Sequence, residues 1–303
     1  MQQFTVMLQL QLQLFTLLGI GCFLGKKKWL TGEGRQCITD IFIKVILPCN
    51  IFVSFQVQFT KEIMEKIFDI LIISFAIQFF CLFLSKVLYQ RSENGRKSVL
   101  QYATICSNSG FMGNPVVEGA YGSMGLLYAS VALIPLRIFM WSAGLSLFTV
   151  ASRKKVIRQL LTHPCIIAVE AGLLFMMTGW TLPQFLQKTV SGLGACVTPI
   201  SMLIIGSILS EVKPTAVFDR ELFRYTIIRL LLIPCAVMLV LKALRFDSLL
   251  IGVSVLLSGM PAGSTTAILA EKYDGDAEFA SKCVLVSTLL SVITLPVLCL
   301  SLS

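Results

Sequence analysis

The sequence predicts an all-α polytopic membrane protein whose ten transmembrane helices form two inverted five-helix repeats. Hydrophobic residues make up 56% of the 303 residues and charged residues only 14%, well below the roughly 25% charged residues of soluble domains. Apolar stretches of about 20 residues, the length that crosses a bilayer, recur along the whole chain. Two of these stretches contain glycine, proline and small polar residues in runs that a lipid-facing helix does not hold.

The first predicted span is expected to be a retained helix and not a cleaved signal peptide. No basic residue precedes it, and Lys26, Lys27 and Lys28 follow it, an order that places its end in the cytoplasm. Nine further spans follow, separated by polar loops. The predicted spans are residues 4–25, 36–57, 67–89, 99–120, 122–150, 164–181, 188–210, 225–244, 248–270 and 280–301.

Basic residues are concentrated in alternate loops. The loops after spans 1, 3, 5, 7 and 9 hold most of the lysine and arginine, as in Arg153-Lys154-Lys155, whereas the other loops hold few. Loops rich in positive charge stay in the cytoplasm. We therefore expect a protein of the cytoplasmic membrane, embedded in the lipid bilayer, with both termini on the outer side. Topology accounts for the net charge of +9, so we expect no nucleic-acid partner.

The basic segment 151–163 divides the chain into a first repeat, residues 1–150, and a second repeat, residues 164–303. Five spans per repeat, an odd number, invert the second relative to the first. Similar landmarks recur at similar places in the two halves, although their sequence identity is weak. These landmarks are Pro48 and Pro115 in the first half, and Pro199 and Pro261 in the second.

Residues 107–117 and 257–266 are predicted to break helices 4 and 9. Pro115 and Pro261 lack an N–H group and clash with the carbonyl one turn back, so such breaks survive only where they line an enclosed or watery cavity. We expect the free ends to meet at mid-membrane and bind an anion, because each helix N-terminus carries roughly +0.5 elementary charge. The predicted substrate-binding residues of the two breaks are Asn108, Ser109, Asn114, Pro115, Gly259, Pro261, Ser264 and Thr265.

The same segments resemble a known family. Asn108, Met112-Gly113-Asn114-Pro115 and Tyr121-Gly122 resemble the fourth-helix signature of the auxin efflux carrier family, which includes plant PIN-type carriers and bacterial permeases. The run from His163 to Leu174 and the run from Pro261 to Pro296 are similar to its sixth, ninth and tenth helices. The resemblance covers essentially the whole chain and fits the bacterial-type short form, since the long loop of larger plant members is absent.

The resemblance implies a fold in which helices 4 and 9 cross and a mobile bundle moves against a scaffold bundle, as in an elevator. It also implies alternating-access transport of a small organic anion, either a malate-like dicarboxylate or an auxin-like monocarboxylate, by a homodimer. A channel of the same fold is the alternative. No acidic cluster marks a sodium site, so the coupling ion is open between H⁺ and Na⁺.

Asn108 ranks first among the expected binding residues, because it stands where the plant carriers place their crossover asparagine. Asn114 either selects the substrate or pairs with backbone groups that Pro115 frees. The resemblance also brings Asn50 of span 2 and Ser201 of span 7 close to the crossover. The alternative for these side chains is a hydrogen bond to a neighbouring helix.

Charged residues inside the membrane are functional candidates. Arg137 in span 5 would balance an anion or form an ion pair with Glu170 of span 6, and Glu170 would alternatively carry a coupling proton. Arg229 lies close enough to the cytoplasmic end of its span to extend to the interface. Glu118 is expected at the outer end of the broken helix, in contact with water.

No enzyme, metal or cofactor is expected. Tyr273-Asp274-Gly275-Asp276 is similar to motifs of aspartyl intramembrane proteases, but these require two aspartates on separate membrane helices. A serine protease would need a histidine near Ser264, whereas His163, the only histidine, is predicted to start a helix at the membrane face. The ten cysteines are scattered without a Cys-x-x-Cys pair, so they form no evident metal site.

Overall fold

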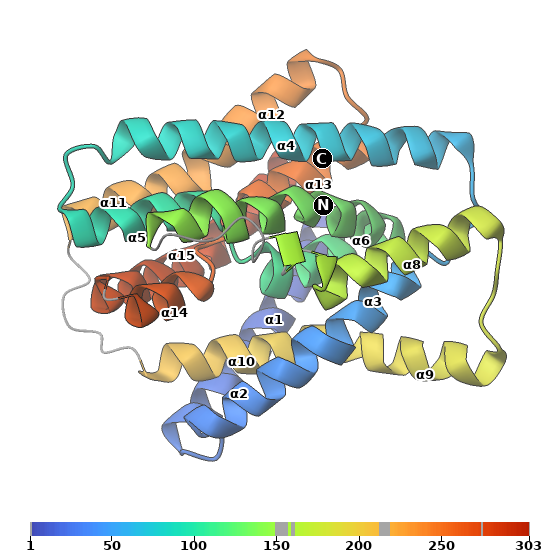
Figure 1. Cartoon of the computed structure of the whole chain (residues 1–303), viewed down its shortest axis with the longest axis horizontal. Coiled ribbons are helices and arrows are strands. Elements are labelled where there is room, and N and C mark those ends of the chain that lie inside the picture. The colour runs from blue at the N-terminus through green and yellow to red at the C-terminus, as the bar shows by residue number, and fades with distance from the viewer. Residues whose placement is uncertain (1, 149–156, 159–160, 212–218, 274, 303) are drawn as a thin grey trace.

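The computed structural model describes the chain except for residues 1, 149–156, 159–160, 212–218, 274 and 303, and the described part is helical (Figure 1). Six helical stretches in it are long and apolar enough to cross a membrane, and three shorter apolar helices accompany them. The prediction of an all-α membrane protein is therefore confirmed. Most of the predicted linker, residues 151–163, lies outside the described residues.

The described helices fall on the ten predicted apolar ranges. Those before residue 150 are α1 (Gln2–Lys26), α2 (Gly32–Ile41), α3 (Leu47–Ser54), α4 (Lys61–Leu88), α5 (Asn94–Ile105) and α6 (Asn114–Phe139). Those after it are α8 (Pro164–Thr178), α9 (Gln184–Ala195), α10 (Val197–Glu211), α11 (Arg220–Ile227), α12 (Ile233–Ala243), α13 (Ser248–Ser258), α14 (Thr265–Lys272) and α15 (Ala277–Leu302).

Three π-helical turns each end two residues before a proline. A proline cannot donate a hydrogen bond and its ring crowds the carbonyl one turn back, so the wider π-helical turn makes room for it within a continuing helix. The turns are η1 (Phe42–Ile46) before Pro48, η2 (Ser109–Gly113) before Pro115, and η5 (Ile228–Leu232) before Pro234.

The first break covers only the start of the predicted segment 107–117. Pro115 belongs to a continuous helical run, and the chain is instead interrupted between Ile105 and Ser109. A second irregularity follows at Gly122, whose positive φ of 65° kinks α6 where span 4 was predicted to give way to span 5. The ninth predicted span is broken as expected, between Ser258 and Thr265, with Pro261 inside the break.

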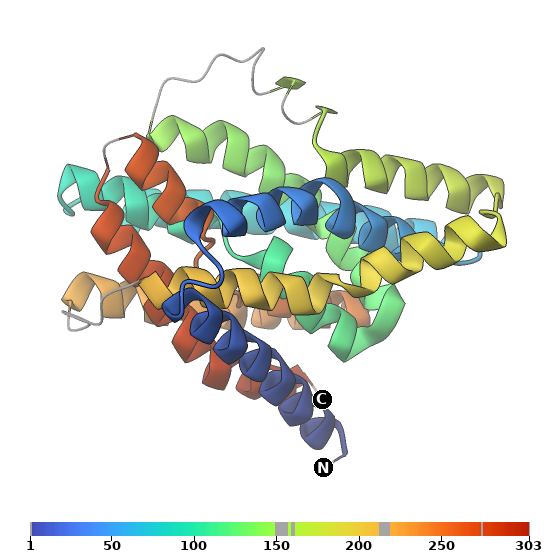
Figure 2. The ribbon, with the colours of Figure 1, turned by 90° about the horizontal axis from the view of Figure 1, so that it is seen from below.

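Close contact between α1 and α10 depends on glycine. Gly21 and Gly25 of α1 and Gly206 of α10 lie where the two helices touch, and a Cβ atom on Gly206 would collide with the carbonyl oxygen of Leu18. Small residues at four-residue spacing allow membrane helices to approach this closely. Figure 2 shows α1 passing against α10, and Figures 1 and 2 both show the two chain ends near each other.

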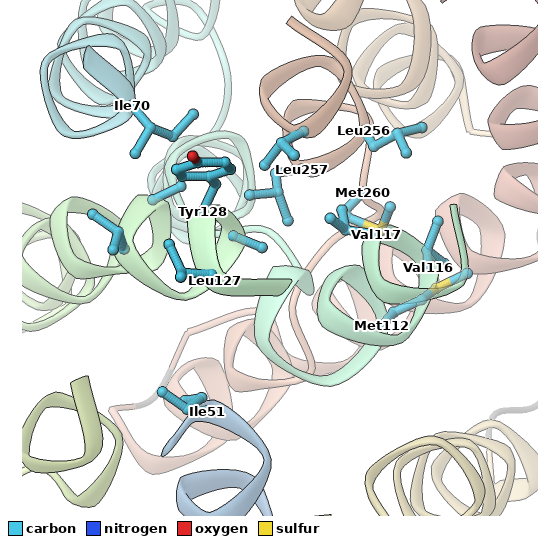
Figure 3. Packing of buried hydrophobic residues seen from close by; sticks show 14 of the residues in the cluster. Ile51, Ile70, Met112, Val116, Val117, Leu127, Tyr128, Leu256, Leu257 and Met260 are labelled. Carbon is cyan, nitrogen blue, oxygen red and sulfur yellow. The ribbon is translucent and has the colours of Figure 1, made fainter. Parts of the chain in front are cut away.

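The main apolar core surrounds the paired breaks. Figure 3 shows side chains of α4, α6 and α13, such as Ile70, Tyr128 and Leu257, packed against one another. A Cβ atom on Gly113 would meet the side chains of Leu257 and Met260, so the chain after the first break packs directly against the second. This packing holds the two irregular segments in one place.

An ionic cluster joins the starts of three helices. The Arg96 guanidinium in α5 contacts Asp219 at 2.8 Å and Asp276 at 3.4 Å, residues that precede α11 and α15. Burial alone would raise the pKa of Asp219, but the N–H groups of Leu222 and Glu221 and the charge of Arg96 outweigh it and lower that pKa. The cluster anchors the end of α5 that lies away from the break.

We expect Gly206→Leu to destabilise the protein, because the added side chain must push α1 away from α10. Overpacking of this kind costs about 1–3 kcal/mol or more, so the melting temperature of the purified protein in detergent should fall by several degrees. Gly19→Leu is the matched control, since a Cβ atom on Gly19 of α1 would meet nothing within 4 Å. Equal melting temperatures for the two variants would contradict the packing argument.

Candidate functional site

The two breaks bond directly to each other. Ser107 and Ala262 form an isolated antiparallel β-bridge. The Asn108 N–H donates to the Pro261 carbonyl at 2.8 Å, and the Gly263 N–H donates to the Cys106 carbonyl at 3.3 Å. Each break thus satisfies backbone groups that the other leaves without helical partners. The prediction that the two interrupted segments meet is confirmed.

Arg229 binds carbonyl groups at the ends of the two helices that lead into the paired breaks. These paired breaks, between Ile105 and Ser109 and between Ser258 and Thr265, are called the junction below. The Nε of Arg229 donates to the Met260 carbonyl at 2.9 Å and its Nη1 to the Thr104 carbonyl at 3.0 Å, and the residue is 2% exposed. Helix C-terminal ends carry unpaired carbonyls and a partial negative charge, which a guanidinium complements. The prediction that Arg229 extends to the membrane surface is wrong, because these carbonyls bind its guanidinium inside the protein.

The hydroxyl of Ser109, a predicted binding residue, is also hydrogen-bonded within the protein. Its Oγ donates to the Leu257 carbonyl at 3.0 Å and lies 2.6 Å from the Oγ of Ser107. It lines a small cavity of about 30 Å³ that Arg229 also borders. Its hydroxyl therefore joins the two breaks and does not face the larger cavity described next.

A larger cavity of about 130 Å³ lies on another side of the junction. Its polar lining includes four predicted residues: Asn108 at the first break, Arg137 of α6, and Ser264 and Thr265 at the start of α14. The remaining walls are mainly apolar and come from η1, α6 and nearby segments, including Ile43, Leu47, Phe111, Leu133, Leu136 and Met140. The tertiary structure thus gathers these four residues around one cavity.

Arg137 dominates the electrostatics of this cavity. The residue is only 6% exposed, and its Nη1 has no hydrogen-bond partner among the described residues. A buried cation that forms no ion pair with the described residues is unfavourable, so the cavity favours an anionic ligand. The start of α14 adds the partial positive charge of a helix N-terminus.

Hydrogen-bond donors surround the same space. Thr265 Oγ1 accepts from the Tyr102 hydroxyl at 3.2 Å, which leaves the Thr265 proton available to a ligand. His163 Nδ1 accepts the Cys165 N–H at 3.2 Å, so the neutral ring carries its proton on Nε2. Together with Asn108, these groups can hold the oxygens of a carboxylate.

His163 combines a predicted role with one that the sequence did not indicate. It caps the start of α8, as expected of a residue that begins a helix. It also lines the cavity beside Arg137. His163 and Arg137 are far apart in the sequence and come together only in the folded protein. The sequence around His163 therefore did not indicate that it lines the cavity.

Several predicted site residues lie away from the cavity. Pro115 is buried in a helical run, and Gly259 caps α13 by donating its N–H to Val255. The Ser201 hydroxyl donates to the Thr198 carbonyl of its own helix at 3.1 Å, which matches the alternative structural role. These residues shape the scaffold but do not line the cavity.

Glu170 does not pair with Arg137. It lies on an exposed face of α8, and no ion pair between the two residues occurs in the described structure. Asn50 and Asn114 lie near Glu118 and not at the cavity, with the Asn50 amide 3.4 Å from the Glu118 carboxylate. Among the described residues no group of three or more His, Cys, Asp or Glu side chains is placed to hold a metal.

Comparison with known proteins places the chain among transporters. The model of a family described as "Membrane transport protein" matches residues 6–299. An "Uncharacterized transporter" of Methanothermobacter thermautotrophicus is 27% identical over 87% of this chain and 88% of its own length. A protein of Rhizobium meliloti named "Putative malonate transporter" is 22% identical over 87% and 85%, and the uncharacterized transporter YfdV of Escherichia coli is 22% identical over 94% of each.

We expect Asn108→Ala to weaken carboxylate binding without lowering the yield of folded protein, because the backbone bonds of the junction remain. Loss of one hydrogen bond to a charged ligand, about 1.5 kcal/mol, corresponds to roughly a tenfold loss of affinity. A thermal-shift screen of the purified protein against mono- and dicarboxylates measures the carboxylate affinity. Ser201→Ala is the control, and unchanged carboxylate affinity in Asn108→Ala would remove Asn108 from the site.

We expect Arg229→Met to destabilise the junction by about 3 kcal/mol, because two buried carbonyls lose their donors. Thermal unfolding in detergent measures the change. The melting temperature of Arg229→Lys should lie between those of Arg229→Met and the wild type, since an ammonium group reproduces the charge but not the forked guanidinium that reaches both carbonyls. A melting temperature of Arg229→Met equal to that of the wild type would show that the two bonds do not support the fold.

Proposed function

Because the chain belongs to the membrane transport protein family, the auxin efflux carrier family that its motifs resemble, we propose that it is a secondary transporter of a small organic anion. It would move this anion across the cytoplasmic membrane by alternating access. The observation that carries the proposal is the unpartnered Nη1 of Arg137 at the cavity beside the paired breaks. A carboxylate there would pair a buried charge that the protein leaves unpaired.

The number of donors favours a short dicarboxylate. Arg137 offers a forked donor for one carboxylate, and Asn108, Thr265 and His163 provide further groups around the same cavity. The relative from Rhizobium meliloti is named for malonate, so malonate is the first substrate to test. Malate and an auxin-like monocarboxylate such as indole-3-acetate are the comparison substrates.

The proposed architecture is two inverted repeats, residues 1–150 and 164–303, which together form a mobile bundle and a scaffold bundle that move past each other. The antiparallel bridge between Ser107 and Ala262 supports it, since equivalent breaks from inverted halves run in opposite directions. Both termini would lie on the outer side, and a homodimer would be the working assembly. Cysteine-accessibility labelling at the chain ends would test the orientation.

Uptake of labelled malonate into proteoliposomes tests the function. A carrier saturates with substrate and is inhibited by unlabelled malate, whereas a channel of the same fold passes malonate without saturation. If indole-3-acetate inhibits the uptake and unlabelled malate does not, the substrate belongs to the monocarboxylate class. Absence of uptake or exchange for every carboxylate, by protein that remains folded after reconstitution, would contradict the proposal.

We expect Arg137→Gln to lower malonate uptake at least about a hundredfold in kcat/KM, because losing one partner of a buried ion pair costs about 3–5 kcal/mol. The same change should raise, or leave unchanged, the melting temperature of the ligand-free protein, because it removes a buried unpaired charge. Uptake kinetics and thermal unfolding measure the two effects. A variant that loses both uptake and stability would point to a structural role for Arg137.

A further inference from the structure

A second cluster of polar groups, two of them buried and one half-buried, lies outside the anion cavity. The Asn50 Nδ2 of α3 donates to the Glu118 Oε2 of α6 at 3.4 Å, while the Asn50 Oδ1 has no partner. Asn114 of α6 is 0% exposed, and both its Oδ1 and its Nδ2 are without partners. Among the described residues, no other asparagine has both amide atoms buried and unpaired.

Helix geometry places these groups together. Asn114 and Glu118 are four residues apart in α6, so they lie one above the other on the same face of the helix. Asn50, which is 5% exposed, approaches that face from α3. The α9 helix packs against the α3 backbone at Asn50, since a Cβ atom on Gly194 would come 3.0 Å from the Asn50 Cα.

The chemistry of the cluster suits a cation. Asn50 and Asn114 each present an unpaired amide oxygen, and Glu118 supplies a carboxylate. Oxygen ligands with one negative charge are what a small hard cation requires. A proton would need only the carboxylate, and the buried amide oxygens would still lack partners, at a cost to stability.

We propose that Asn50, Asn114 and Glu118 form a sodium site, separate from the cavity that holds the anion. The sites have opposite charge: Arg137 attracts the carboxylate, and Glu118 attracts the cation. If the chain is the secondary transporter proposed above, sodium bound here travels with the anion and offsets its charge. Binding of sodium itself does not depend on that function.

Thermal unfolding of the purified full-length protein tests the site without any organic anion. Sodium chloride, compared with choline chloride at equal ionic strength, should raise the melting temperature by about 2 °C at ten times the dissociation constant. Glu118→Gln and Asn114→Leu should each weaken the apparent sodium affinity at least about tenfold. A wild-type melting temperature that is the same in both salts, or that responds only to pH, would overturn the proposal.

Two control variants separate the sodium site from other effects. Ser254→Ala removes a buried, unpartnered hydroxyl elsewhere in the protein and should keep the full sodium response. Asn108→Ala should also keep it, because Asn108 belongs to the anion cavity. Loss of the response in either control, with the protein still folded, would show that the sodium effect is not specific to the cluster.

Uptake experiments distinguish failure of this site from failure of the proposed function. Sodium-dependent malonate uptake that Glu118→Gln abolishes supports both. If sodium stabilises the protein but no carboxylate is taken up, the sodium-site proposal stands and the transport proposal is wrong. If the protein takes up malonate but neither its stability nor its transport depends on sodium, the sodium-site proposal is wrong and the transport proposal stands.

Discussion

Every backbone group freed by a broken membrane helix needs a partner within the protein, and this requirement organises the structure. Hydrocarbon offers no hydrogen bonds, so an isolated break would be costly. Here the two breaks pair through Ser107 and Ala262 and through the Asn108 N–H and the Pro261 carbonyl. Arg229 then binds the carbonyls of Thr104 and Met260. The irregular segments are stable only because each lies against the other.

The polar groups that this arrangement leaves unsatisfied are the ones able to bind ligands. Ser109 and Arg229 are hydrogen-bonded at the junction, whereas the Arg137 Nη1 and the Asn114 amide are buried and have no partners among the described residues. A stable protein rarely retains such groups unless something binds them. In the two proposals above, Arg137 binds an anion and Glu118 with its neighbouring amides binds a cation, a combination that fits a transporter that moves a charged solute with compensating charge.

The prolines of the two predicted breaks have different effects. Pro261 lies within an interruption, but Pro115 is accommodated by the π-helical turn of residues 109–113, and the chain is interrupted before that turn. The sequence showed that the segment departs from a regular helix, because glycine, proline and asparagine are unusual in an apolar span. It did not show where, because a proline can be absorbed by a local widening or by a full break, and packing decides between them.

By itself the sequence determined the class of protein, the positions of its apolar helices and the two segments that depart from them, because apolar length and residue composition are local properties. It also singled out Asn108, Arg137, Ser264 and Thr265. Only the tertiary structure decided which polar groups are satisfied. Arg229 and Arg137 are both arginines in apolar segments, yet Arg229 binds a carbonyl 125 residues away in the chain, and the Nη1 of Arg137 has no partner in the part of the chain that the structure describes. Hydrogen-bond partners are set by how distant segments pack, which composition and spacing do not record.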